Sequence, residues 1–318
     1  MPDLYPRIEP YASGMLDVGD GNRVYWEECG NPDGVPAVVL HGGPGSGCTP
    51  DHRRFFDPAR TRVVLFDQRQ CGRSTPHAGE PSVDLSSNTT AHLIADIERL
   101  RLARGIDRWL VLGGSWGTTL GVAYAQAHRD AVRALVLFAV TTTRRSEIDW
   151  LYRGAGQHFP QAWSRFRDGA GGAPDLVGAY ARLVNDPDPA IREKAARDWC
   201  DWEDAVVAIG PNHKPHPRWG DPRFRMAFAR IVTHFFSHGA WLEEGALIRD
   251  AQRLAGIPGV LIHGARDLST PLITAQELHA AWPGSELIVI DDAGHETRTP
   301  SMRETIVAVL DRFATAAP

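Results

Sequence analysis

The sequence has few cysteines, no long hydrophobic run and no block of positive charge, and each absence argues against a class of protein. The cysteines lie far apart, without the spacing of a metal site or of a small disulfide framework (Cys29, Cys48, Cys71 and Cys200). We therefore expect reduced thiols in a cytoplasmic protein. No apolar stretch reaches the length of a membrane span, and the first residues lack the basic and apolar regions of a signal peptide.

Charge and composition are those of an ordinary globular protein. The 318 residues carry 34 basic and 39 acidic side chains, a net charge of −5, with 43% hydrophobic and 23% charged residues. Because no basic run stands out, neither nucleic acid nor an anionic membrane is an expected partner. No two histidines have the spacing of metal ligands on one helix face, so we expect neither a metal nor a cofactor. The sequence does not indicate an oligomeric state.

The most informative stretch is the G-x-S-x-G motif of residues 113–117. A strand-like run (109–112) leads into it and a helix-like run (118–128) leads out of it, which is the context of a nucleophile elbow. Glycines stand two residues before and after Ser115, where side chains would collide as strand and helix close on each other. Ser115 would also lie at a helix N-terminus, where free N–H groups favour developing negative charge. The alternative is a glycine-rich turn with an incidental serine.

Short apolar runs recur along the chain and alternate with helical patterns. The runs have the character of buried strands (37–40, 62–67, 109–112, 134–138, 259–263 and 286–290). Residues 23–29 have the pattern of an edge strand, and residues 1–22 that of a surface lead-in. Together these patterns predict an α/β fold with a mostly parallel central sheet and helices on both faces.

Between residues 141 and 250 the strand-like runs disappear. Aromatic and charged residues recur there at helical intervals, and six of the ten tryptophans lie in this stretch. We therefore expect a helical cap domain at 141–250, inserted into a core domain formed by 1–140 and 251–318. The aromatic residues predict a small helical core. They also suggest a pocket wall over Ser115, and the two interpretations are compatible.

An acid and a histidine follow the last two predicted strands. Asp267 comes just after the run 259–263, and His295 just after the run 286–290. The order Ser, Asp, His along the chain is the one expected for a catalytic triad on this scaffold. His295 would take the proton of Ser115 and later give it to the leaving group, while Asp267 would hold the imidazole in place.

A glycine-rich loop, 41–45, follows the run 37–40. Glycines just past the end of a strand let backbone N–H groups approach a ligand closely. We expect the N–H groups of Gly43 and of Trp116, the residue after the serine, to form the oxyanion hole. They would stabilise the negative charge of the tetrahedral intermediate.

Competing assignments for these roles carry less weight. Asp292 is expected to be a surface turn residue, His263 at a strand end to be structural, and His41 to organise its glycine loop. Either of two cysteines would be the nucleophile only if Ser115 were not (Cys48 and Cys71).

Taken together, these motifs resemble those of the proline iminopeptidase (prolyl aminopeptidase) family of α/β-hydrolases, through nearly the whole chain. Besides the elbow and the glycine loop, the resemblance covers further stretches (5–21, 24–30, 67–69, 71–74, 88–90, 96–100 and Phe159-Pro160 with Trp163). It implies an α/β-hydrolase fold with an inserted helical cap. It also implies a serine aminopeptidase that releases N-terminal proline through an acyl-enzyme. The implied substrate is a small peptide or an amino-acid amide.

The resemblance also implies residues that bind the substrate. An exopeptidase must recognise a free ammonium group, and carboxylates do this with charge-assisted hydrogen bonds. Glu203 matches the first amine-binding carboxylate of the family, and its neighbour Trp202 is expected in the pocket wall. Val232 stands where the family has a second glutamate, and two other positions also depart from the family pattern (Gln70 and Ala91).

These departures leave other functions open. The chain could instead hydrolyse a small ester, lactone or amide, or transfer an acyl group, with no requirement for a free amine. A binding module that kept the fold without the activity is a third interpretation. The presence of Ser115, Asp267 and His295 together argues against it.

Overall fold

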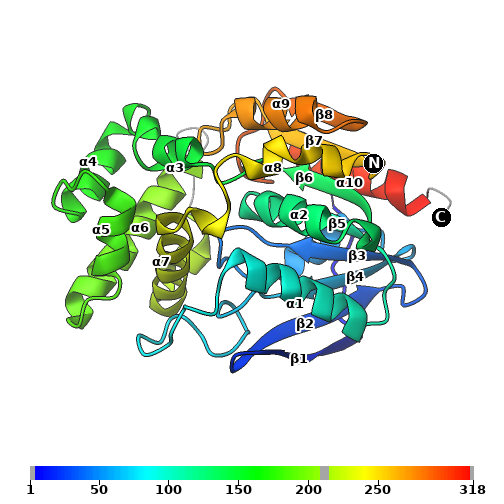
Figure 1. The fold of residues 1–318 in the computed structure, drawn as a ribbon, viewed down its shortest axis with the longest axis horizontal. Helices are drawn as coiled ribbons and strands as arrows, with labels where there is room; N and C mark the ends of the chain where they lie inside the picture. Colours follow the sequence, from blue (N-terminus) through cyan, green and yellow to red (C-terminus); the bar gives the residue numbers. More distant parts are fainter. Residues whose placement is uncertain (1–3, 208–214, 316–318) are drawn as a thin grey trace.

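The computed structural model describes residues 4–207 and 215–315 and is built around an eight-stranded sheet (Figure 1). The strand order is β1-β2-β4-β3-β5-β6-β7-β8. β2 pairs antiparallel with both β1 and β4, whereas the pairs from β4 to β8 are parallel, which confirms the predicted mostly parallel sheet. The strands are β1 (Ala12–Gly19), β2 (Asn22–Gly30), β3 (Val35–Leu40), β4 (Thr61–Phe66), β5 (Trp109–Gly114), β6 (Val132–Phe138), β7 (Gly259–Gly264) and β8 (Ser285–Ile290).

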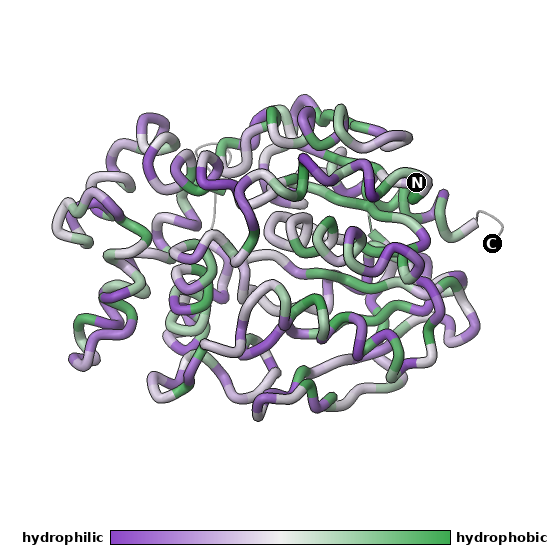
Figure 2. Tube along the Cα trace, viewed as in Figure 1, coloured by the Kyte–Doolittle hydropathy of each residue, from purple (hydrophilic) through white to green (hydrophobic). Residues whose placement is uncertain are grey.

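Both faces of the central strands are buried. In β3, Val38 and Leu40 lie in one hydrophobic cluster, whereas Ala37 and Val39 lie in another on the opposite face. Because successive side chains of a strand point to opposite faces, a strand covered on both sides needs a continuous apolar sequence. Figure 2 shows this hydrophobic colour along the central strands.

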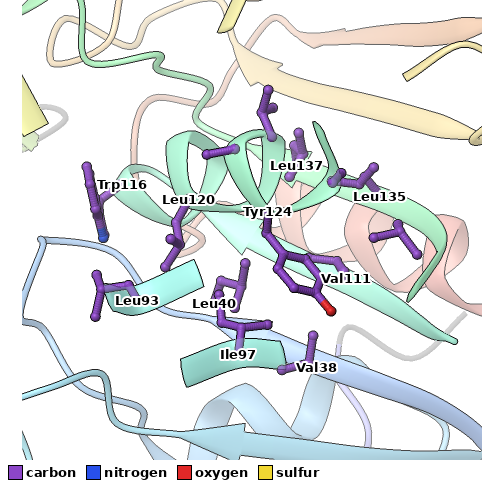
Figure 3. Close-up of a cluster of buried hydrophobic side chains, with 14 of the residues drawn as sticks. Val38, Leu40, Leu93, Ile97, Val111, Trp116, Leu120, Tyr124, Leu135 and Leu137 are labelled. Atoms are coloured by element: carbon purple, nitrogen blue, oxygen red, sulfur yellow. The ribbon is translucent and has the colours of Figure 1, made fainter. Parts of the chain in front are cut away.

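Helices cover the two faces unequally. The first face carries most of them, and Figure 3 shows part of its cluster between the strands, α1 and α2. These helices are α1 (Thr90–Ala103), α2 (Trp116–Ala127), α8 (Ala246–Arg249) and α9 (Leu272–Ala281). The second face is covered by α10 (Pro300–Thr315), which packs on β6 and β7. Within the described ranges, no helix combines the length and the hydrophobicity needed to cross a bilayer.

A second group of helices lies to one side of the sheet, away from both ends of the chain (Figure 1). Its interior is rich in aromatic rings, as the sequence predicts: Phe166 stacks on Tyr180 with ring centroids 4.6 Å apart and on Trp202 at 5.4 Å. Every described element between residues 145 and 254 is helical. The group comprises α3 (Arg145–Tyr152), α4 (Pro160–Gly169), α5 (Leu176–Leu183), α6 (Pro189–Val207) and α7 (Pro222–Ser237).

Two predictions for the N-terminal region are wrong. Residues 12–19 form β1 rather than a surface lead-in, and they pair antiparallel with β2. β2 is therefore not an edge strand, since it lies between β1 and β4. In β1 only Val18 is fully buried, so this strand has neither a continuous apolar run nor a clear alternation that would reveal it.

Candidate active site

Ser115 stands in the tight turn between β5 and α2. Its backbone has φ 54° and ψ −124°, a conformation that non-glycine residues adopt only when the surrounding structure imposes it. A Cβ atom on Gly113 would collide with the backbone of Gly117, and one on Gly117 with the carbonyl group of Leu40. The turn therefore requires both glycines of the motif, and it presents Ser115 to a cavity.

That cavity has a volume of about 620 Å³, within the range of small-molecule sites. Its wall combines residues at the carboxyl ends of the strands with residues of the second helical group. The lining includes Gly43, Ser115, Trp116, Glu203, Arg218 and His295. Five residues to which the sequence assigned a role therefore lie around one cavity: Gly43, Ser115, Trp116, Glu203 and His295.

Asp267 and His295 come together because β7 and β8 are parallel neighbours and each residue follows one of them. Nδ1 of His295 lies 2.9 Å from Oδ2 of Asp267. The other carboxylate oxygen, Oδ1, accepts the N–H groups of Ser269 and Thr270, both at 2.9 Å. The Thr270 hydroxyl donates to Oδ2 at 2.6 Å. These bonds fix the carboxylate in the orientation in which it receives the imidazole N–H.

The pKa values of Asp267 and His295 are shifted in opposite directions. Burial would raise the pKa of Asp267, but the charge and the hydrogen bond of His295 outweigh it and lower the pKa. Burial acts to lower the pKa of His295, but the charge of Asp267 and its hydrogen bond raise it above the ordinary value of 6.5. The site therefore favours an imidazolium beside a carboxylate, the state that forms when a histidine accepts the proton of a serine.

The competing histidines have structural partners. His263 accepts the N–H of Val140 at 3.0 Å through Nδ1, and its Nε2 lies 2.7 Å from the carbonyl oxygen of Thr270. His41 accepts the N–H of Gln68 at 3.0 Å through Nε2, and its Nδ1 lies 2.9 Å from the carbonyl oxygen of Gly42. With both ring nitrogens engaged by the backbone, each histidine organises a loop.

The glycine loop approaches the elbow directly. A Cβ atom on Gly42 would come within 3.3 Å of the Cβ of Ser115. Gly43 has φ 113°, a conformation open to glycine. Trp116 is the first residue of α2, so its N–H has no carbonyl partner within the helix. Both residues line the cavity beside Ser115, where donors to an oxyanion are required.

Gln68 has no role assigned from the sequence, yet its side chain links these two segments. Its Oε1 accepts the indole N–H of Trp116 at 3.0 Å, and its Nε2 donates to the carbonyl oxygen of His41 at 3.0 Å. Its membership of the family-like stretch 67–69 was the only signal in the sequence.

Glu203 projects from α6 into the cavity, and the hydroxyl of Tyr152, another residue missed in the sequence, donates to its Oε1 at 2.5 Å. Burial raises the pKa of Glu203 to about 7, although Tyr152, His295 and Arg218 oppose the rise. A carboxyl group of this kind gains most from a cationic ligand, because a positive charge restores the ionised form.

The expectation that Trp202 forms part of the pocket wall is wrong, and Val232, which stands where the family has a second glutamate, also lies outside the cavity lining of the described residues. Trp202 is 1% exposed, packs in the aromatic interior and donates its indole N–H to the carbonyl oxygen of Leu151 at 3.2 Å. It is not among the described residues that line the cavity. Val232 on α7 is fully buried in the same aromatic cluster, so an apolar side chain suits its position.

Comparison with known proteins agrees with this geometry. Residues 36–297 match the sequence profile of the α/β hydrolase fold family. A probable proline iminopeptidase of Streptomyces coelicolor is 52% identical over 98% of both chains. A proline iminopeptidase of Xylella fastidiosa is 46% identical over 98% of this chain and 100% of its own. The crystal structure of proline iminopeptidase from Mycobacterium smegmatis has the same fold, with a TM-score of 0.61, 21% identity and coverage of 96% and 100%. The chain therefore belongs to the proline iminopeptidase family of α/β-hydrolases.

Proposed function

We propose that this protein is a serine aminopeptidase that releases N-terminal proline from small peptides or amino-acid amides. The observation that carries the proposal is the carboxylate of Glu203, which lines the same cavity as Ser115 and His295. A carboxylate in the same cavity as a nucleophilic serine suits a substrate whose ammonium group lies close to the scissile bond. The names of the relatives support proline as the residue released.

The reaction proceeds through an acyl-enzyme. His295 takes the proton of Ser115 as Oγ attacks the prolyl carbonyl carbon, and Asp267 stabilises the imidazolium. The N–H groups of Gly43 and Trp116 bind the oxyanion. His295 then protonates the leaving amine, and water releases proline by the reverse sequence. Apolar side chains of the cavity hold the pyrrolidine ring (Phe138, Ile148, Leu151, Phe228 and Phe236).

In this proposal the chain forms two domains, one with the catalytic triad and one with the carboxylate that binds the substrate amine. Residues 1–140 and 251–318 form the core domain with the triad, and residues 141–250 form the cap domain with Glu203. The separate aromatic cluster of α3 to α7 supports this division, while α8 packs back onto the core helices. The four free thiols are consistent with a cytoplasmic location.

The test compares amine release from a prolyl amide, an alanyl amide and an N-acetyl-prolyl amide, with Ser115→Ala as the blank. We expect a prolyl preference that is lost on acetylation. Glu203→Gln should lower kcat/KM on the prolyl amide about 10- to 100-fold, because a charged hydrogen bond is lost. Glu193→Gln, on the exposed side of the same helix, is the matched control and should act like the wild type.

A second candidate is a hydrolase or acyltransferase for a small ester, lactone or amide with no amine requirement. The sequence observation behind it is Val232, which stands where the family has a second glutamate; in the structure Val232 is buried in the aromatic cluster and is not among the described residues that line the cavity. This candidate predicts Ser115-dependent cleavage of a simple ester and of the acetylated amide, unaffected by Glu203→Gln. A collapse of ester cleavage in that variant would count against it.

A further inference from the structure

Arg218 lines the catalytic cavity from the short helical turn Pro217–Gly220, just before α7. Its guanidinium lies over the rings of Trp219 and Phe224, 4.8 Å and 5.2 Å from their centroids. Its Nε is buried and has no hydrogen-bond partner in the described part of the chain. A buried donor without a partner is unfavourable, so this group is poised for an acceptor that the described residues do not supply.

The other arginines of the cavity wall differ from Arg218. Arg54 and Arg303 donate to backbone carbonyl groups, at 3.0 Å and 3.2 Å. Arg298 forms an ion pair with Glu296 at 3.0 Å. These three guanidinium groups therefore have acceptors within the protein, whereas the Nε of Arg218 has no acceptor among the described residues.

Arg218 shares the cavity wall with the residues expected to handle the two halves of the substrate. Glu203, His295 and Glu296, the residue after His295, all line the same cavity as Arg218. Burial lowers the pKa of Arg218, and the negative charges of Glu296 and Glu203 both oppose this effect. Because His295 protonates the leaving amine, the released part of the substrate leaves from this cavity, within which Arg218 lies.

We propose that Arg218 binds a carboxylate on the released part of the substrate. The inference rests on the aminopeptidase function proposed above. The carboxylate is the C-terminus of a short peptide or an acidic side chain next to the proline. Glu203 and Arg218 then recognise opposite charges of one short zwitterionic peptide, since the planar guanidinium matches a carboxylate with two parallel hydrogen bonds. A ring-stacked guanidinium is held in one orientation, which reduces the entropy lost on binding.

The test measures kcat/KM for three substrates: Pro-Ala with a free carboxylate, Pro-Ala amide and Pro-Asp amide. For a C-terminal subsite we expect the wild type to prefer Pro-Ala over its amide about tenfold. An acidic-side-chain subsite would instead favour Pro-Asp amide over Pro-Ala amide. Arg218→Met should bring the operative ratio close to one. Since each ratio is taken within one variant, general damage to the catalytic machinery cancels.

Arg223→Met is the matched control, because Arg223 is an exposed arginine in the first turn of α7, five residues after Arg218, and lies 3.8 Å from Glu80. It should keep the wild-type ratio. If Arg218→Met does not fold, Arg218→Lys serves in its place and should retain only part of the preference, since lysine lacks the planar fork.

The outcomes separate the two proposals. Wild-type ratios near one for both comparisons, or a preference that survives the change at Arg218, would overturn the subsite and leave the aminopeptidase intact. Absence of Ser115-dependent cleavage of all three peptides would overturn the proposed function, and the subsite with it.

Discussion

Trp116 donates its indole N–H to Oε1 of Gln68 at 3.0 Å, and the same glutamine holds the carbonyl oxygen of His41. One side chain thereby sets the separation between the elbow and the glycine loop, the two segments that carry the proposed oxyanion donors. Two donors act together only when both point at one oxygen atom. The link should therefore affect the rate of the chemical step more than substrate affinity.

Trp116→Phe tests this link, because it removes the indole N–H and keeps an aromatic ring. We expect kcat on a prolyl arylamide to fall about tenfold with KM nearly unchanged, since the loosened donors stabilise the transition state less. Trp109→Phe is the control: Trp109 is also buried, but its Nε1 has no hydrogen-bond partner among the described residues. Equal losses of kcat in the two variants would mean that Trp116 acts through its packing and not through its hydrogen bond to Gln68.

Much of the scaffold could be predicted from the sequence, because the evidence was local. The buried strands are apolar on both faces, and Asp267 and His295 directly follow strands that are neighbours in the sheet. The order of the residues along the chain and their places at strand ends were therefore enough to single out Ser115, Asp267 and His295. Ser115 and His295 line one cavity, and Oδ2 of Asp267 lies 2.9 Å from Nδ1 of His295.

What could not be predicted depends on orientation or on distant contacts. Trp202 and Glu203 are adjacent on α6, and successive residues of a helix point about 100° apart, so one faces the cavity while the other faces the aromatic interior. Gln68 and Arg218 lie in connecting segments without periodicity. Their contacts arise only when segments far apart in the chain meet.

Asp267→Asn tests the role of the acid. An asparagine of the same shape can donate to Nδ1 of His295 and so stabilise the wrong tautomer, which is why we expect kcat to fall about 10⁴-fold. The change should leave KM and the melting temperature little altered. Asp292→Asn is the control, since Asp292 is exposed and accepts the hydroxyl of Ser301 at 2.6 Å. A loss of kcat in Asp292→Asn but not in Asp267→Asn would assign the role of the triad acid to Asp292.

The cysteines near the cavity should be unreactive. Cys71 is buried and donates to the carbonyl oxygen of Gln68 at 3.3 Å, and Cys48 donates to that of Phe66 at 3.3 Å. Burial raises the pKa of both thiols well above the ordinary value, so little thiolate exists at neutral pH. We expect activity to survive iodoacetamide at pH 7.5, followed by residual turnover and intact mass. Inactivation with alkylation at either residue would contradict this.

Glu203 should couple stability to pH in the direction opposite to that of an ion-paired carboxylate. Its pKa is about 7 in the folded protein, against an ordinary value of 4.5. Between these values the folded state holds a proton that the unfolded state has lost. The free energy of unfolding therefore falls as pH rises through this window, and the loss is complete above about pH 7.

Glu203→Gln removes this titration while its amide oxygen can still accept the Tyr152 hydroxyl. We expect the variant to be more stable than the wild type at pH 8, by no more than about 3 kcal/mol, and equally stable near pH 4. Urea denaturation at both pH values measures the difference, and Glu193→Gln should follow the wild type at each. A variant that gains stability at pH 8 but loses cleavage of free-amine substrates would show that this carboxylate opposes folding and serves binding. A variant that is less stable at pH 8 would instead assign Glu203 a structural role.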